Sequence, residues 1–550
     1  MLTEEQIEEY REAAEQIVRP LEDYLLRDLA ERVAAAGELT STAAYQVWKL
    51  QELGLSQKQI KQKLAELLDT GQEEIERLLT QSAVDGYRFG LSRLPTGEGI
   101  PFEKNESLQA VVAEAVKMAG EGLANITQTL GMTDPTGRAL PLREVYRKTC
   151  DFAFTQVVTG TTDYQTAIRR ATRELAEKGV CVVDYASGRH ISVEAAVRRN
   201  VFGAMGLIQE KINADYHDRL GCDGWEISAH AASAPDHEPI QGKQYTDEEY
   251  ARLNDSLIRR IGTLNCAHSA LPIRIGIDRP IHSPEELREL REKNEEGITY
   301  GGRHYTSYEA KQHRRELERK IRQQRKRILV DEATGDTEKL QNDRIRLVTM
   351  ESGYKRFCDA TGARQEYARL EVTKYGPKQA TQAKKTAEQH HRNSLAEIGA
   401  KNSELNTLDK YEDAKYNNSP AYRMLSGYTR AVEKGDISPL VGLETYQQVA
   451  DDVRTQIVGR TTATGVRIES FATHFVDRVI GQTSTPHEGM RCGVPIADVL
   501  DALQNPVETG AVRHLQDGDI RQTFTGKTAD VTVSIRDKRL IQTNPKKGGH

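Results

Sequence analysis

Histidine and cysteine side chains gather in one short region of the sequence that could bind a metal ion. Neutral imidazole and thiolate groups are good zinc ligands, and four of them can complete a tetrahedral site. The candidate ligands are His230, His237, Cys266 and His268, with Cys222 as a further candidate. Their spacing argues against zinc, because Cys-x-His is too tight for the usual zinc knuckle and the first two histidines are not at a helical i,i+4 repeat. We therefore expect a loop-rich core that Trp225 and side-chain hydrogen bonds hold together, with no metal and no other cofactor.

A second region with suitable chemistry lies near the end of the chain, in FATHFVDRVIGQTSTPHEGMRCGV (471–494). His474 and Arg478 are one helical turn apart, so both would lie on one face of a helix. An imidazole can accept or donate a proton near neutral pH. The same pair also has a purely structural interpretation, because it can cap the helix or form salt bridges with Asp477 or Asp498.

Apolar residues at helical spacing predict that most of the chain up to residue 410 is helical. In the first ninety residues we expect one helix over 3–36, a second from Ser41 toward Leu53 and a third from Ser56 onward. A short β-hairpin over 180–193 interrupts the helical pattern. Further helices are expected over 105–130, 141–158, 162–178 and 193–219.

The segment Lys311–Arg327, KQHRRELERKIRQQRKR, is more than half basic and predicts a long surface helix. A solvated helix is the expected state, since Glu316 and Glu318 can pair locally with its cations. Contact with DNA is the alternative, because clustered Lys and Arg side chains release counterions from phosphates.

Composition limits the class of protein. The chain has 550 residues, 37% of them hydrophobic and 29% charged, with a net charge of −6 that argues against a globally cationic coat for nucleic acid. No apolar run approaches the roughly 18 residues that a membrane helix needs, so we expect no membrane contact. The acidic, amphipathic N-terminus is unlike a signal peptide, and the six scattered cysteines suggest a reducing compartment.

The last hundred residues change character. Helical patterns over 445–457, 471–480 and 496–504 precede strand patterns over 511–515, 520–525, 529–535 and 539–543. The fold class is therefore multidomain, with mainly α-helical N-terminal and central regions, a small β element, and a C-terminal α+β domain with a small antiparallel sheet. The expected divisions are a helical bundle (1–95), a central helical domain with the hairpin and the His/Cys/Trp loop region (96–282), charged long helices (283–410), a linker (411–443) and the α+β domain (444–550).

The middle of the chain carries a family signature. The segments WEISAH, APDHEPIQGKQY and NCAHSALPI resemble the signature of the phage minor capsid protein 2 family, and the resemblance covers about residues 1–400. It implies a phage or prophage protein of the virion that acts in head morphogenesis at the portal end. The resemblance implies no enzymatic activity for this region. Implied partners are the portal and major capsid proteins. Packaged DNA is a further candidate partner through the basic residues of Lys311–Arg327. Implied locations are the host cytoplasm during assembly and then the phage head.

The C-terminal region resembles a different family. The pieces HFVDRVIG and LIQTNP, with helices followed by strands over about 465–545, are similar to the polymorphic toxin type 50 domain and to the barnase/EndoU/RelE-like ribonucleases. This resemblance implies metal-independent cleavage of an RNA substrate. Such cleavage needs a base for the 2′-hydroxyl, an acid for the 5′-oxygen and cations for the phosphorane. The implied catalytic residues are His474, Arg478, Arg521 and Thr543, the implied phosphate contacts are Arg491 and Lys527, and His487 or His514 could be the second proton-transfer group.

Together the two resemblances indicate a minor capsid protein that carries a ribonuclease-like domain into the host with the genome. One alternative is a purely structural head protein whose C-terminal domain is an inactive adaptor. The other is a polymorphic toxin whose helical region serves as a delivery module.

Overall fold

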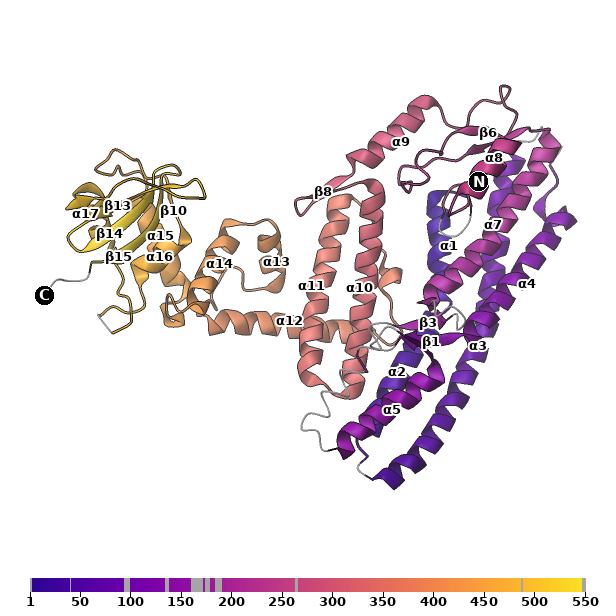
Figure 1. The fold of residues 1–550 in the computed structure, drawn as a ribbon, viewed down its shortest axis with the longest axis horizontal. Helices are drawn as coiled ribbons and strands as arrows, with labels where there is room; N and C mark the ends of the chain where they lie inside the picture. Colours follow the sequence, from indigo (N-terminus) through magenta and orange to yellow (C-terminus); the bar gives the residue numbers. More distant parts are fainter. Residues whose placement is uncertain are drawn as a thin grey trace. The chain divides into compact units, whose positions relative to one another are not determined.

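The structure is a computed structural model in which two compact units are distinguished. We call them the N-terminal unit (Met1–Ala383) and the C-terminal unit (Lys384–His550) (Figure 1). The predicted fold class is confirmed: helices dominate and several small antiparallel sheets accompany them. The residues that the structure describes are 2–39, 41–92, 99–133, 138–159, 172–173, 179–183, 190–262, 266–485 and 488–546.

Long helices form most of the N-terminal unit (Figure 1). They are α1 (Glu4–Gln16), α2 (Arg19–Ala36), α3 (Thr42–Leu91), α4 (Glu106–Gln128), α5 (Leu142–Val158), α7 (Val193–Leu220), α8 (Asp247–Ser256), α9 (Pro284–Glu296), α10 (Ser307–Thr334) and α11 (Thr337–Thr361), with 3-10 turns η1 (Phe102–Lys104) and η2 (Tyr367–Leu370) and with α12 (Pro377–Glu397) following. The helices predicted over 105–130, 141–158 and 193–219 are confirmed. The one predicted over 162–178 lies outside the described residues except at 172–173.

The single helix predicted over 3–36 is wrong, because the chain turns between α1 and α2. Thr3 caps α1, with its hydroxyl accepting a hydrogen bond from the Gln6 amide. Pro20 explains the interruption: proline has no N–H to donate to the carbonyl four residues earlier, and its ring clashes with that carbonyl. It therefore fits only in the first turn of a new helix.

The prediction of two helices between Ser41 and Leu91 is also wrong, because α3 is one continuous helix of 50 residues. Ser41 caps it by accepting a hydrogen bond from the Ala44 amide. Ser56 has the residue type of a cap but lies inside the helix, where its hydroxyl donates to the Asp28 carboxylate of α2 at 3.1 Å. A tertiary partner thus replaces the local cap that the sequence suggested.

Small sheets occupy the breaks between helices. The first has the order β2-β1-β3-β4, and its β3–β4 pair confirms the predicted hairpin, with the connecting residues 184–189 outside the described part. The second has the order β6-β5-β7, and β8 and β9 form a separate hairpin. The bounds are β1 (Leu130–Thr133), β2 (Ala139–Pro141), β3 (Val180–Val183), β4 (His190–Ser192), β5 (Gly224–Ile227), β6 (Gln244–Thr246), β7 (Ala270–Ile273), β8 (Ile298–Tyr300) and β9 (Arg303–Tyr305).

The C-terminal unit is an α+β fold (Figure 1). Its helices are α13 (Leu408–Tyr416), α14 (Pro420–Glu433), η3 (Pro439–Val441), α15 (Leu443–Gln456), α16 (Thr473–Ile480) and α17 (Ile496–Gln504), and its strands are β10 (Ser470–Phe471), β11 (Glu508–Thr509), β12 (Arg513–His514), β13 (Ile520–Thr525), β14 (Ala529–Ser534) and β15 (Arg539–Pro545). The sheet has the order β10-β15-β14-β13-β11, with β12 also on β13. Only the short β10–β15 pairing is parallel among the described strands of this sheet.

The segment 411–443 is not the predicted linker, because it forms most of α13, all of α14 and η3. Its polar composition conceals a spaced apolar stripe, Leu425, Tyr428 and Ala431, which packs in a core that also holds Tyr446 and Val476. The C-terminal fold therefore depends on residues well before 444. The other predicted domain boundaries stay predictions.

Among the described helices, none is both long and apolar enough to cross a membrane.

Candidate functional site

Three of the predicted metal-ligand candidates meet in the N-terminal unit, beside the β6-β5-β7 sheet. His237, Cys266 and His268, here called the His–Cys group, place their ligand atoms within 4.8 Å of one another. Cys266 and His268 come immediately before β7, and His237 lies in a turn closed by the Gln241 amide bonding to its carbonyl at 3.1 Å. The three are buried, with exposed fractions of 1% for His237, 7% for Cys266 and 3% for His268.

The atoms of the His–Cys group are arranged around the sulfur. Cys266 Sγ lies 3.3 Å from Nδ1 of His237 and 3.5 Å from Nδ1 of His268. The other ring nitrogens face oxygen atoms: His237 Nε2 is 2.9 Å from the Arg259 carbonyl oxygen, and His268 Nε2 is 3.1 Å from Oε1 of Gln241.

Two further residues of this region were candidates in the sequence. The ring of His230 lies near that of His268, with centroids 4.4 Å apart, but outside the His–Cys group. Cys222 precedes the opposite end of β5, since Gly224 pairs with Ile273 there while Ile227 pairs with Ala270 next to the group.

Burial keeps the His–Cys group uncharged when no ion is bound. Burial lowers the pKa of His268 well below its ordinary value, with the neighbouring His230 and His237 adding to the shift. Burial also lowers the pKa of His237, and it raises the pKa of the Cys266 thiol. Trp225 stacks on His217 and lies against Tyr250.

In the C-terminal unit, α16 brings His474 and Arg478 together as predicted. Arg478 donates from Nε to Nε2 of His474 at 3.1 Å, and His474 Nδ1 lies 3.3 Å from the Asp477 carboxylate. Arg478 also donates to Oδ1 of Asn544 on β15 at 3.3 Å. We call His474, Asp477 and Arg478 the His474 group. The side chain of His474 is 42% exposed, whereas that of Asp477 is buried.

Asp477 also has a hydrogen-bond partner on another helix, which the sequence did not indicate. Tyr446 on α15 donates its hydroxyl to Oδ1 of Asp477 at 2.8 Å. Burial raises the pKa of Asp477, against the opposing hydrogen bonds from Tyr446 and His474. The predicted phosphate contact Arg491 also lies here, but its guanidinium donates to the backbone carbonyls of Asp436 and Asp477. Arg491 therefore ties a loop to α16.

The other predicted catalytic residues lie apart from His474. Thr543 is fully buried, and its hydroxyl donates to the Asp530 carbonyl at 2.9 Å. Arg521 pairs with Asp519 at 2.6 Å. In the register of the sheet Arg521 is level with Arg539, five residues along β15 from Asn544, which corresponds to about 16 Å.

The remaining candidates are divided between the two ends of the sheet. Lys527 is exposed on the turn between β13 and β14, at the end of the sheet where Asn544 lies. His514 is exposed on β12 opposite Ile520, at the far end. His487 lies outside the described residues. Asp436, His474 and Asp477 also offer ligand atoms within 4.8 Å of one another, so a cation could bind there.

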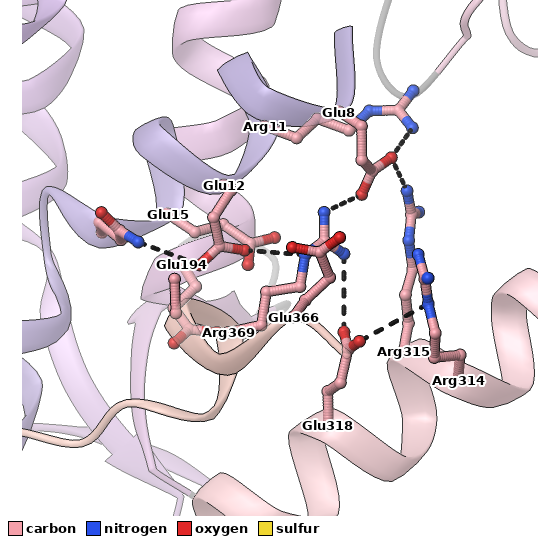
Figure 2. Close-up of polar contacts among 12 residues, drawn as sticks. Glu8, Arg11, Glu12, Glu15, Glu194, Arg314, Arg315, Glu318, Glu366 and Arg369 are labelled. Atoms are coloured by element: carbon pink, nitrogen blue, oxygen red, sulfur yellow. Dashed lines mark hydrogen bonds and ion pairs between the residues drawn. The ribbon is translucent and has the colours of Figure 1, made fainter. Parts of the chain in front are cut away.

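A partly buried network of ion pairs links four elements of the N-terminal unit (Figure 2). Glu8 on α1 pairs with Arg315 on α10 and with Arg369 in η2. Arg369 also pairs with Glu318 of α10, which is only 2% exposed. Glu194 on α7 joins through Arg322 at 2.9 Å. Burial alone would raise the pKa of Glu8, but the nearby arginines outweigh burial and hold that pKa far below its usual range.

This network corrects the prediction of a surface helix over Lys311–Arg327. Helix α10 packs against α2 and α11, and it buries Ile321 and Ile328. Its cations reach carboxylates of other elements: Lys311 and Arg315 pair with Glu8, Arg322 with Glu194, Arg325 with Glu351, and Lys326 with Glu22. The expected local pairing holds for both acids: Glu316 pairs with Lys320 at 2.7 Å and Glu318 with Arg314 at 3.6 Å. The basic segment is thus largely neutralised inside the protein.

Comparison with known proteins identifies one family. The profile of the family described as "Phage minor capsid protein 2" matches residues 2–359. No curated protein and no solved structure matches the chain. The match covers well over half of the 550 residues. It includes the His–Cys group and the labelled residues of Figure 2 other than Glu366 and Arg369. The chain therefore belongs to the phage minor capsid protein 2 family.

Proposed function

We propose that the chain is a minor structural protein of the phage head, located at the portal end, and that its N-terminal unit is the part incorporated into the particle. The observation that carries this proposal is the extent of the family match. Residues 2–359 lie entirely within the N-terminal unit, which ends at Ala383, and none of the match extends into the C-terminal unit.

The ion-pair network supports a role for the N-terminal unit as a single structural body whose helices stay together under mechanical load. It joins residues that are far apart in sequence, such as Glu8 and Arg369, and it is mostly shielded from solvent. Separating the helices would leave charges of this network without their partners in a shielded environment. The network therefore strongly opposes local separation of the helices.

Purified particles test the structural role. Quantitative mass spectrometry should find the protein at a few copies per particle, and gold-labelled antibody should mark one vertex. Absence from purified particles would remove the virion assignment. Labelling spread evenly over the head would retain the virion assignment and overturn the portal location.

Contact of packaged DNA with Lys311–Arg327 is not part of the proposal. The phosphate backbone needs accessible cations, whereas Arg322, Arg325 and Lys326 of this segment already pair with carboxylates of the same chain.

We further propose RNA cleavage as the function of the C-terminal unit, on the strength of the His474 group. Asp477 lies beside Nδ1 of a half-exposed imidazole, so Nε2 is the nitrogen that would accept a proton. Nε2 of His474 would take the proton of the 2′-hydroxyl as that oxygen attacks phosphorus and forms a 2′,3′-cyclic phosphate; the bond to the 5′-oxygen breaks, and the leaving 5′-oxygen would take a proton from water. Arg478, released from Nε2, would turn its guanidinium to the phosphate oxygens.

The C-terminal unit expressed as residues 384–550 tests this activity. A shorter piece from residue 440 would remove Leu425 and Tyr428 from the core that holds Tyr446. We expect RNA cleavage that falls about 100-fold or more in His474→Ala. His514→Ala is the matched control, because His514 is an exposed histidine at the far end of the sheet. Intact RNA with all three proteins, each folded by circular dichroism, would remove the nuclease proposal.

A further inference from the structure

We propose that the His–Cys group is a zinc site, in which Cys266 Sγ and the Nδ1 atoms of His237 and His268 bind the ion. Thiolate and imidazole are the ligands that zinc prefers, whereas magnesium and calcium favour oxygen. The inference does not depend on the proposed role in the phage head, because it concerns the isolated protein.

The distances within the group suit a tetrahedral ion. With a Zn–S bond of about 2.3 Å and a Zn–N bond of about 2.05 Å, tetrahedral geometry holds sulfur and nitrogen about 3.6 Å apart. The corresponding distances from Cys266 Sγ are 3.3 Å to His237 and 3.5 Å to His268. Both sulfur–nitrogen distances are therefore within a few tenths of an ångström of those that a tetrahedral ion would impose.

The protons of the group provide the strongest argument. His237 Nε2 faces the Arg259 carbonyl, which only accepts hydrogen bonds, so Nε2 carries the proton and Nδ1 a lone pair. His268 Nε2 faces Oε1 of Gln241, and that orientation of the Gln241 amide is supported by the hydrogen bond it accepts from the His230 amide. Nδ1 of His268 therefore also carries a lone pair.

Two lone pairs thus converge on one sulfur atom. A thiol has one proton and can satisfy only one of them, and the other would be buried against sulfur without a donor. The sulfur in addition accepts a hydrogen bond from the His268 amide at 3.4 Å. A cation at the centre satisfies all three atoms at once.

The partners of the ring nitrogens match the usual surroundings of a metal site. Histidines that bind a metal commonly donate their other N–H to a backbone carbonyl or to a carboxylate or similar oxygen, which fixes the ring and its tautomer. Both histidines of the group have such a partner. The short Cys-x-His spacing is no obstacle, since the third ligand comes from a separate turn 29 residues before Cys266.

The fourth position of the ion would be taken by solvent. A cavity of about 150 Å³ adjoins the group and is lined by His230, Ala234 and Tyr308 among others. That volume is several times the roughly 30 Å³ that one water molecule takes up. Three protein ligands with one solvent position is an established coordination for zinc.

Metal analysis of the full-length chain tests the site. We expect about one zinc per chain when the protein is purified from zinc-supplemented cells, and a loss of about tenfold or more in Cys266→Ala and in His268→Ala. Cys358→Ala is the matched control, because Cys358 is a buried thiol of the same unit in a different core cluster. Zinc retained in Cys266→Ala would overturn the proposal.

Cobalt provides a readout that does not depend on how well the variants fold. Titrating Co²⁺ into the metal-free full-length wild-type chain should produce a thiolate-to-cobalt absorption band, together with the visible bands of a tetrahedral ion. His237→Cys should still bind cobalt, because sulfur replaces nitrogen as a ligand. A zinc-free wild-type protein that gives no such band would also overturn the proposal.

Discussion

The two histidine groups of this chain differ in what their ring nitrogens face. In the His–Cys group both Nε2 atoms donate to oxygen and both Nδ1 lone pairs meet a buried sulfur. In the His474 group the ring lies between a carboxylate and a guanidinium and is 42% exposed. The first arrangement suits an ion and the second suits proton transfer. Residue type alone does not separate these roles, whereas the partner of each nitrogen does.

The two units also differ in how their charged groups are held. The largest expected change in stability comes from the ion-pair network of the N-terminal unit. Glu8→Gln leaves Arg315 and Arg369 without their shared carboxylate in a shielded network. We expect the unfolding free energy of the N-terminal unit to fall by about 3–5 kcal/mol. Urea denaturation of the full-length chain, followed by a signal from this unit, measures the change.

Glu66→Gln is the control for that measurement, because Glu66 forms an exposed pair with Lys63 and should leave stability unchanged. Acid adds a second readout. The pKa of Glu8 is lower in the folded chain than its ordinary value of 4.5, so its contribution is present above that pH and is lost as the pH falls further. Glu8→Gln should therefore be less sensitive to acid than the wild type. Equal stability of wild type and Glu8→Gln would show that the network does not hold the unit together.

In the C-terminal unit, the corresponding test removes the hydrogen bond from Tyr446 to Asp477, the carboxylate that His474 contacts. Tyr446→Phe removes the hydroxyl that donates to Asp477 at 2.8 Å. We expect the unfolding free energy of this unit to fall by about 1.5–3 kcal/mol, as is usual for a hydrogen bond to a charged group. Tyr422→Phe, at a partly buried tyrosine of the same core, is the control. A loss no greater than in the control would place Asp477 outside the stabilising contacts of the fold.

Proton release on metal binding distinguishes the two groups by pH. Burial lowers the pKa of both imidazoles of the His–Cys group and raises that of the Cys266 thiol. Between about pH 8 and 6 the thiol alone would lose a proton to zinc, so the dissociation constant should rise about tenfold for each unit of falling pH. Competition with a chromophoric chelator measures this slope. A slope of about two protons would mean that one imidazole is protonated in the metal-free chain, contrary to its burial.

Local structure could be predicted well from the sequence because its causes are local. The apolar repeat of α7 and the alternation of β13 to β15 are set by neighbouring residues, and all of them lie close to the predicted bounds. Errors arose where a distant residue decided the outcome. Ser56 bonds to Asp28, and the cations of α10 pair with carboxylates more than a hundred residues away. Composition shows that such residues are polar, but it does not show which distant residues they pair with.

The candidate sites show the same limit. The residue types of the His–Cys group and the one-turn spacing of His474 and Arg478 were visible in the sequence, and the structure brings both sets together. Arg521 and Thr543 could not be placed, because their distance from His474 depends on strand order and register. Tyr446 and Asn544 carry no local signal, since each reaches the His474 group from another element.

The smallest expected effect gives the final test of the comparison. His474→Ala should change the unfolding free energy of the C-terminal unit by less than about 0.5 kcal/mol, because the side chain is half-exposed. His268→Ala in the other group removes a buried ring and should cost several times more. If His474→Ala were instead as destabilising as Tyr446→Phe, the ring would serve mainly to hold Asp477 and Arg478. The structural interpretation of that pair would then be correct, and the proposal of RNA cleavage would lose its proton acceptor.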